Sequence, residues 1–344
     1  MRRKSFAVLA AACAVAALAV TATTGSAAHR ASVKVALVTD IGGLNDHGFN
    51  HLANLGITRA EKLPGVTGRV YITNTSQDRI GNLEAAAKDG YGMVIATGFN
   101  FFSDLPQVAP AFSSTKFVGV DIPAASVTPA QQNYHGLVFK EQEAGYLVGY
   151  IAGLMIKRHP YHGKQVVSGV GANPVAAIVH YLAGFRAGAK KADPKVKVLL
   201  NYANDPTFND QTKCKVTTQG QIARGSGIVF EAAGGCGLGG LSAAKQKGIW
   251  GIGVDADQGY LGSFMLTSAM KRVDNAVYLA IKDYATNPGG FQGNTDTVFD
   301  AKNGGVGYAP LSKKVSKADR AYILPRVNKI LQQIASGKIK PPTK

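Results

Sequence analysis

Residues 34–50, KVALVTDIGGLNDHGFN, predict a strand, a glycine-rich turn and the beginning of a helix. Residues 35–38 form an unbroken apolar run, which is typical of a strand buried on both faces of a parallel sheet. Gly42 and Gly43 allow the positive φ angles of a tight turn. A helical pattern of apolar residues then runs from His51 to Lys62.

Polar and aromatic side chains follow this first strand. In open α/β sheets, ligands bind beyond the carboxyl ends of the strands. The side chains expected there offer acceptors, an amide and one flat apolar face: Asp40, Asn45, Asp46, Phe49 and Asn50. Alternatively, Asn45 or Asp46 caps the helix and Phe49 is its first core contact. This stretch alone leaves both interpretations open.

The same pattern repeats along the chain. Three further apolar runs end in Thr73-Asn74, Thr97-Gly98 and Asp121, and a second series of runs leads to Asp255. Alternating strands and helices with polar strand ends are typical of doubly wound α/β folds. We therefore predict two Rossmann-like lobes with a ligand cleft between them.

The predicted organisation has four parts. Residues 1–28 form a signal peptide, and residues 337–344 form a flexible tail. The N-terminal lobe comprises residues 31–139 plus 258–287, and the C-terminal lobe comprises residues 140–257 plus 288–336.

Two helices allow more specific predictions. In the predicted helix 141–157, glycines at positions 145, 149 and 153 form a ridge that permits close helix packing; a membrane helix dimer is the alternative. The last predicted helix, 317–336, is expected to be interrupted or to restart at Pro325.

The N-terminus predicts export. Arg2, Arg3 and Lys4 precede an apolar run from residue 6 to 20, and small residues follow at 26–28, as in a secretory signal peptide. A retained membrane anchor is the alternative, although the run is short for a span. Cys13 faintly resembles a lipoprotein cysteine, so lipid anchoring stays open. We expect the protein in the periplasm or at the cell surface.

The formal net charge is +17, and removal of the three N-terminal cations leaves +14. Such charge favours non-specific phosphate binding. However, the cations are scattered and no nucleic-acid motif is present, so no nucleic-acid partner is expected. The charge also suits anionic polymers of the cell envelope. Lys313, Lys314 and Lys317 are expected to form a solvated face.

Cys214 and Cys236 are expected to form a disulfide, because an exported protein meets an oxidising compartment. No Cys/His spacing suits zinc, and no Walker A loop or nucleophile elbow occurs. We therefore expect no metal, no cofactor and no catalysis. A general acid–base pair of Asp255 and Asp257 is the alternative. Lys271 is expected to be a buried cation paired with one of these aspartates, rather than a surface lysine.

Phe49, Phe99 and Phe208 each follow a strand end. Aromatic rings in such loops can stack on a planar ligand. Core packing is the alternative for any one of them.

Several ordered motifs resemble a known family. Residues 40–50, DIGGLNDHGFN, resemble the opening motif of the basic membrane protein family of ABC-transporter substrate-binding lipoproteins, of the purine nucleoside receptor type. Similar stretches are FKEQEAGYLVGY at 139–150, GFRAG at 184–188, FND at 208–210, AGG at 233–235, GVDADQ at 253–258 and TSAMK at 267–271. His47-Gly48 departs from the family's usual Lys-Ser.

The resemblance implies the type I periplasmic binding protein fold and a protein that hands a nucleoside to a membrane permease. We expect the protein to be a monomer. Phe49 and Phe208 would sandwich the base, Asn50 and Asp121 would bind its polar edge with help from Asp40, and Asp255 and Lys271 would hold the ribose hydroxyls; Gly234 completes the implied site. A sugar or another polar metabolite is the alternative ligand. A nucleoside-cleaving hydrolase is the alternative from another class.

Overall fold

The computed structural model describes residues 32–344. The predicted signal peptide and Cys13 lie outside the described residues.

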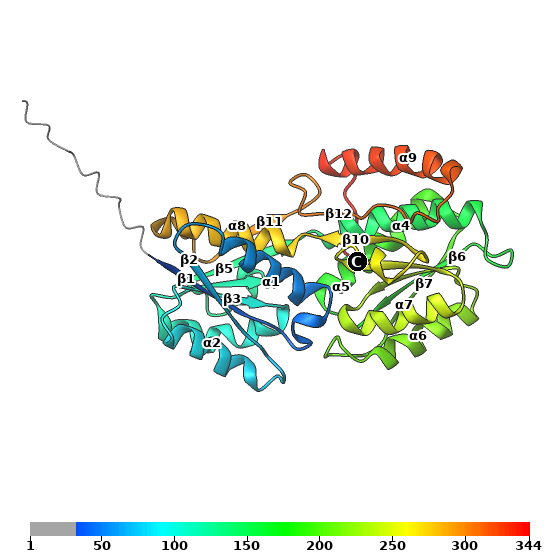
Figure 1. The fold of residues 1–344 in the computed structure, drawn as a ribbon. Helices are drawn as coiled ribbons and strands as arrows, with labels where there is room; N and C mark the ends of the chain where they lie inside the picture. The colour runs from blue at the N-terminus through cyan, green and yellow to red at the C-terminus, as the bar shows by residue number, and fades with distance from the viewer. Residues whose placement is uncertain (1–31) are drawn as a thin grey trace, which may run out of the picture. The chain divides into compact units, whose positions relative to one another are not determined.

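Two six-stranded sheets form the framework of the fold (Figure 1). The first sheet is parallel, in the order β11-β5-β4-β3-β1-β2. The second has the order β12-β10-β9-β8-β6-β7, in which β12 pairs antiparallel. The strands span Val33–Val38 (β1), Val66–Tyr71 (β2), Met93–Thr97 (β3), Lys116–Val120 (β4), Tyr134–Phe139 (β5), Val166–Gly171 (β6), Lys197–Tyr202 (β7), Ile228–Ala232 (β8), Trp250–Asp255 (β9), Met265–Lys271 (β10), Thr295–Phe299 (β11) and Val306–Tyr308 (β12).

Helices lie between most successive strands, as the doubly wound prediction requires, whereas no α-helix lies between β4 and β5, between β9 and β10, or between β11 and β12. They span Phe49–Ala60 (α1), Asp78–Lys88 (α2), Leu105–Val108 (α3), Glu141–Arg158 (α4), Ala176–Ala192 (α5), Gln211–Ala223 (α6), Gly237–Gln246 (α7), Val273–Thr286 (α8) and Lys317–Ala335 (α9). The apolar run at 35–38 is fully buried within β1, as its composition predicts.

Two strands lie in the opposite sheet from the one expected. β10 pairs with β9 in the second sheet, and β11 pairs with β5 in the first. A strand's sequence shows that it is buried but not which neighbour it joins. α8 packs on α1, so we define the N-terminal lobe as residues 32–139 and 273–299, and the C-terminal lobe as 140–272 and 300–344.

The glycine ridge of α4 packs against α5, as predicted. A Cβ atom at Gly145 or Gly149 would overlap the carbonyl oxygens of Tyr181 and Phe185 on α5, so only glycine permits this helix separation. Among residues 32–344, no helix is long and apolar enough to cross a bilayer.

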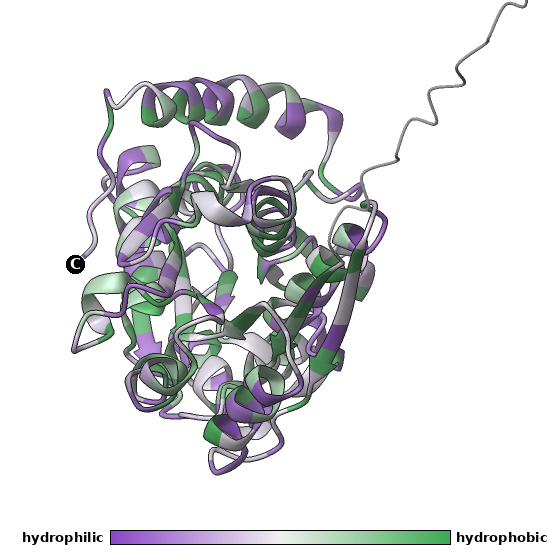
Figure 2. Ribbon diagram, turned by 90° about the vertical axis from the view of Figure 1, so that its left-hand side faces the viewer, coloured by the Kyte–Doolittle hydropathy of each residue, from purple (hydrophilic) through white to green (hydrophobic). Residues whose placement is uncertain are grey.

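The predicted interruption of the last helix is wrong. α9 is continuous through Pro325, and its hydrophobic and hydrophilic residues alternate along the helix (Figure 2). Ile323 precedes the proline and Val327 follows it, and both are fully buried. Because α9 packs against α4, these buried contacts hold the helix together across the missing N–H of the proline.

Candidate functional site

A cavity of about 350 Å³ is lined by residues that follow strands of both sheets. Asp40 follows β1 and Asp121 follows β4, whereas β9 and β10 end in Asp255 and Lys271. The structure brings all eight of the predicted ligand-binding residues to this cavity: Asp40, Phe49, Asn50, Asp121, Phe208, Gly234, Asp255 and Lys271.

The loop after β1 is fixed by two carboxylates. Asp46 accepts hydrogen bonds from the backbone N–H groups of Asn50 at 2.7 Å and His51 at 3.0 Å in the first turn of α1, although the N-cap residue of this helix is Gly48 and not Asn45 or Asp46. Asp40 accepts from the Asn100 amide at 2.8 Å, and its own N–H donates to Asn50 Oδ1 at 3.0 Å. Asp40 and Asn50 therefore hold each other in place at the cavity wall.

Three half-buried aromatic rings line the cavity. Phe49 and Phe99 belong to the N-terminal lobe, and Phe208 belongs to the C-terminal lobe. The rings of Phe99 and Phe208 meet edge to face, with centroids 6.2 Å apart. The Lys271 ammonium lies 5.3 Å from the centroid of the Phe49 ring. All three rings thus meet the cavity, as expected from their places after strands.

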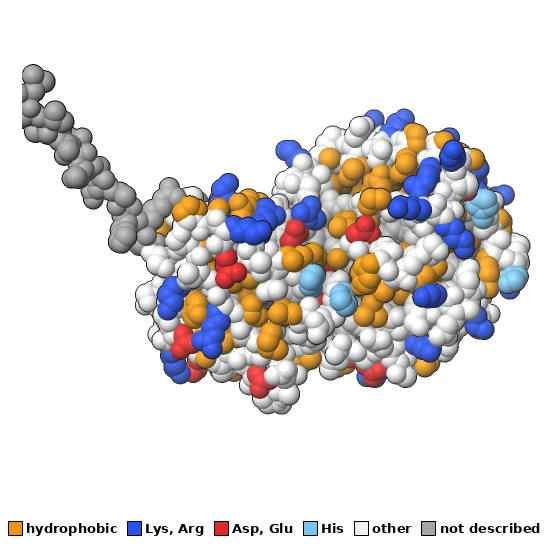
Figure 3. Space-filling view, in the orientation of Figure 1, with side chains coloured by type: hydrophobic (Ala, Val, Ile, Leu, Met, Phe, Trp, Pro, Cys, Tyr) orange, Lys and Arg blue, Asp and Glu red, His pale blue; other side chains and the backbone are white. Residues whose placement is uncertain are grey.

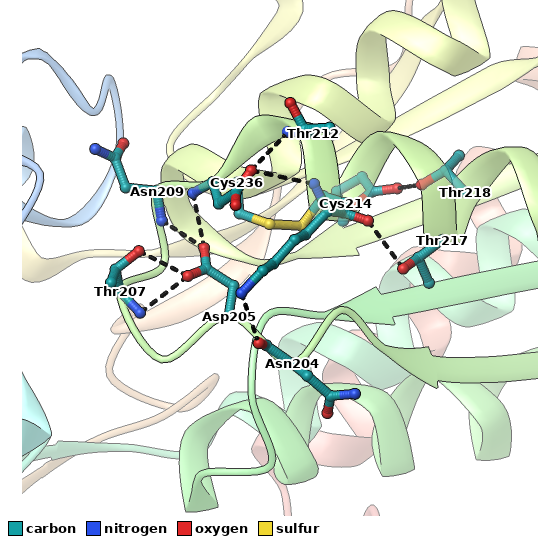
Figure 4. Close-up of a disulfide and its surroundings, with 12 residues drawn as sticks. Asn204, Asp205, Thr207, Asn209, Thr212, Cys214, Thr217, Thr218 and Cys236 are labelled. Carbon is teal, nitrogen blue, oxygen red and sulfur yellow. Dashed lines mark hydrogen bonds between the residues drawn. A yellow bond between two sulfur atoms is a disulfide. The ribbon is translucent and has the colours of Figure 1, made fainter.

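Phe208 is held by the loop around it. Its φ angle is +58°, which non-glycine residues adopt only when their surroundings impose it. Asp205 accepts hydrogen bonds from Thr207 N and Thr207 Oγ1 and from Asn209 N, between 2.6 and 3.0 Å (Figure 4). The Cys236 N–H donates to the Phe208 carbonyl at 2.9 Å.

The predicted Cys214–Cys236 disulfide is confirmed, with Cα atoms 5.5 Å apart (Figure 4). It joins α6 to the turn at Gly234–Cys236, which also lines the cavity. The disulfide, the Asp205 loop and Phe208 therefore form one connected support.

Lys271 is a buried cation, as predicted, but its predicted partners are wrong. Its Nζ lies 2.5 Å from Asp121 Oδ2 and 2.9 Å from Glu141 Oε1. Asp255 instead accepts from the Tyr181 hydroxyl at 3.0 Å. Asp257 is exposed, because the positive φ of Asp255, +63°, turns the chain and ends the strand alternation.

Burial changes the pKa values of the ionisable side chains around Lys271, which we call the Lys271 cluster: Lys271, Asp121, Glu141, Asp255 and Tyr181. Burial raises the pKa of Asp121 to about 7, although the Lys271 ammonium opposes the shift. Burial likewise raises the pKa of Asp255 to about 6. Burial alone would lower the pKa of Lys271, but the carboxylates of Asp121 and Glu141 outweigh it and raise that pKa.

Carboxylates outnumber cations among the charged side chains that line the cavity. Lys271 is the cation that lines it, against the carboxylates of Asp40, Asp46, Asp121 and Asp255. Asp121 Oδ1 is buried and has no hydrogen-bond partner in the part of the chain that the structure describes. The walls therefore suit a ligand that donates hydrogen bonds and carries no negative charge.

Two residues of the Lys271 cluster, Glu141 and Tyr181, were not predicted as members of the site. Glu141 lies inside the quoted stretch 139–150, so that motif could have indicated it. Tyr181 comes from the apolar face of α5, where sequence alone indicates core packing. Within residues 32–344, no group of three or more His, Cys, Asp or Glu side chains is arranged to hold a metal ion.

The fold and the cavity define a two-lobed binding protein for a small solute. A family model described as ABC transporter substrate-binding protein, PnrA-like (Bmp) matches residues 33–340. The ABC transporter nucleoside-binding protein BmpA of Lactococcus lactis is 31% identical, over 92% of this chain and 90% of its own. A CD4+ T-cell-stimulating antigen of Listeria innocua is 30% identical, over 90% of this chain and 88% of its own.

A solved structure supports the same assignment. An ABC transporter solute-binding protein of Aeropyrum pernix has a TM-score of 0.79 and 25% identity, and the match covers 91% of this chain and 94% of that one. The chain therefore belongs to the PnrA-like (Bmp) family of ABC transporter substrate-binding proteins. It is an exported solute-binding protein and not an enzyme, so the hydrolase alternative is rejected. The predicted type I periplasmic binding protein fold is confirmed.

Proposed function

We propose that this protein binds a nucleoside with a purine base in the cavity and delivers it to the permease of an ABC transporter. The observation that carries the proposal is one cavity that combines Phe49 and Phe208 with the largely buried carboxylates of Asp121 and Asp255. Aromatic rings provide flat faces for a base, and carboxylates provide paired acceptors for a diol.

Each part of a nucleoside has a suitable partner. Phe49 and Phe208 would stack on the base from the two lobes. The free Asp121 Oδ1, with Asn50 and Asp40, would accept hydrogen bonds from its polar edge. Asp255 and Lys271 would hold the ribose hydroxyls. Binding to both lobes would favour the closed arrangement, because the ligand then gains contacts from each.

The charge of the cavity argues against nucleotides. A phosphate would meet several carboxylates and a single lysine that two acids already neutralise. The name of the Lactococcus relative, a nucleoside-binding protein, supports a nucleoside as the ligand class.

A thermal-shift panel tests the proposal with adenosine, guanosine, inosine, cytidine, adenine, ribose, glucose and AMP. A nucleoside at 100 times its dissociation constant should stabilise the fold by about 2.7 kcal/mol. AMP should shift the melting temperature much less than adenosine. Shifts with ribose or glucose and none with nucleosides would assign the cavity to sugars instead.

Two variants and a control complete the test. Phe49→Ala and Asp255→Ala should abolish the nucleoside shift. Phe49→Ala should leave the melting temperature of the free protein nearly unchanged, whereas Asp255→Ala also removes the acceptor of the buried Tyr181 hydroxyl, so its shift is measured against its own ligand-free melting temperature. Leu55→Ala, an exposed residue outside the cavity, should retain the full shift. Wild-type shifts in the two cavity variants would contradict the assignment of the site.

A further inference from the structure

The charges divide unequally between the two lobes. The N-terminal lobe has 8 Lys and Arg against 11 Asp and Glu, a net charge of −3. The C-terminal lobe has 26 Lys and Arg against 10 Asp and Glu, a net charge of +16. Lys and Arg side chains gather over the C-terminal lobe on the face drawn in Figure 3. The positive charge of residues 32–344 is therefore carried by the C-terminal lobe alone.

The C-terminal segment 300–344 concentrates this charge. It has ten Lys and Arg and two acids. Both acids are already neutralised from outside the segment: Asp300 accepts from Lys140 at 2.8 Å, and the buried Asp319 accepts from Arg158 at 2.7 Å. None of the ten cations forms a salt bridge with any residue in 32–344.

Exposed cations lie along α9 and its N-terminal flank, and they wrap around the exposed side of the helix, because Lys317 and Arg326 are nine residues apart and so lie on its two flanks. We call this the α9 surface and define it by five exposed residues: Lys313, Lys314, Lys317, Arg326 and Lys329. The opposite side of α9 is apolar and packs on α4. Unpaired cations on a surface with no exposed acid repel one another, a cost that an anionic partner would remove.

We propose that the α9 surface binds a flexible, phosphate-bearing polyanion of the cell envelope. A flexible chain fits better than a flat bilayer because cations also lie on other sides of the C-terminal lobe, such as Lys190 and Lys191 at the end of α5 and Lys245 and Lys247 at the end of α7. A bilayer meets one face, whereas a polymer follows a curved surface and releases counterions along its length.

The proposed polyanion site and the solute cavity carry charges of opposite sign. Among the residues that line the cavity, the charged groups are four carboxylates and the Lys271 ammonium, so the cavity repels phosphate, whereas the α9 surface has cations without salt bridges. The polymer should therefore bind without occupying the cavity, and would retain the protein in the envelope while it captures solute.

The proposal is tested by measuring the affinity of the full mature chain for fluorescently labelled inorganic polyphosphate at salt concentrations between about 50 and 200 mM. Replacing Lys313, Lys317, Arg326 and Lys329 by Gln removes four exposed cations from the α9 surface. The matched control replaces four exposed cations of the N-terminal lobe by Gln: Lys62, Arg69, Lys88 and Lys282. Both variants change the net charge equally.

In the fourfold Gln variant of the α9 surface, the slope of log affinity against log salt should be shallower than in the wild type by roughly 3. Each of the four lost contacts should reduce the slope by about 0.7, the value for single-stranded nucleic acids. The control should keep the wild-type slope, and Lys329→Gln alone should reduce it by less than one. Both multiple variants should melt as the wild type does. Equal losses in both variants, competition by a nucleoside, or capture by phosphatidylglycerol vesicles without polyphosphate binding would overturn the proposal.

Discussion

Lys271 Nζ lies 2.5 Å from Asp121 Oδ2, so the last residue of β10 in the C-terminal lobe is ion-paired with the residue that follows β4 in the N-terminal lobe. Glu141, the first residue of α4, is the second partner of the same ammonium at 2.9 Å. The Lys271 side chain is 2% exposed. One buried cation therefore connects three segments next to the cavity.

Replacing Lys271 by Met is expected to destabilise the protein strongly. The substitution leaves the buried carboxylates of Asp121 and Glu141 without their cation, which costs about 3–5 kcal/mol when one partner of a buried pair is removed. Urea denaturation at pH 8 measures this loss. At pH 5 the deficit should shrink, because protonation of Asp121 removes one of the uncompensated charges.

Lys282→Met provides the control for this substitution. Lys282 is exposed on α8, and surface changes of this kind stay within about 0.5 kcal/mol. Equal stabilities of the two variants would show that the buried ion pair contributes little.

Asp255 should make stability depend on pH. Burial raises the pKa of Asp255 from its ordinary 3.8 to about 6. Between these values the folded protein holds a proton that the unfolded chain has released, so this residue's contribution to stability falls as pH rises from 4 to 6. Relative to Asp255→Asn, the unfolding free energy of the wild type should fall by about 1.4 kcal/mol per pH unit in this window. A constant difference across the window would contradict it.

The same residue should couple nucleoside binding to pH. Ribose hydroxyls donate hydrogen bonds to the ionised carboxylate, so bound nucleoside favours the deprotonated form of Asp255. Affinity should rise by up to about tenfold between pH 5 and 6, where the free protein still holds the proton. Titration calorimetry measures this rise, and Asp255→Asn should bind weakly with no such dependence.

The Cys214–Cys236 disulfide should support binding through Phe208. Replacing both cysteines by Ser frees the turn whose Cys236 N–H bonds the Phe208 carbonyl at 2.9 Å. The fold should lose about 2–4 kcal/mol, and nucleoside affinity should fall as well. In the Phe208→Ala background the cysteine substitutions should not reduce affinity further, because the aromatic contact they support is already gone.

Ile330→Val is the control that separates the loss of nucleoside affinity in the cysteine variant from a general loss of stability. Ile330 is buried on α9 outside the cavity, and the change costs about 1 kcal/mol. Its nucleoside affinity should equal that of the wild type. If the cysteine substitutions and Phe208→Ala instead reduce affinity additively, the disulfide acts independently of Phe208.

The sequence predicted the cavity residues better than their partners. Asp40, Asp121 and Asp255 could be placed because residues at the carboxyl ends of parallel strands share one edge of a sheet. The ion-pair partners of Lys271 could not, since its Glu141 contact depends on how α4 lies against β10. The sheet positions of β10 and β11 were missed for the same reason: strand pairing across a long separation leaves no local pattern.

The α4–α5 contact yields a prediction about packing alone. At Gly149, an added methyl group would overlap the backbone carbonyl oxygen of Phe185, which cannot rotate away. Gly149→Ala should therefore destabilise the protein by about 1–3 kcal/mol or more, despite the better helix propensity of alanine. Gly220→Ala on α6, where no atom lies within 4 Å of the new methyl group, should stabilise it by about 0.5–1 kcal/mol. Urea denaturation compares the two variants, and an unchanged or raised stability of Gly149→Ala would show that α4 and α5 can separate without cost.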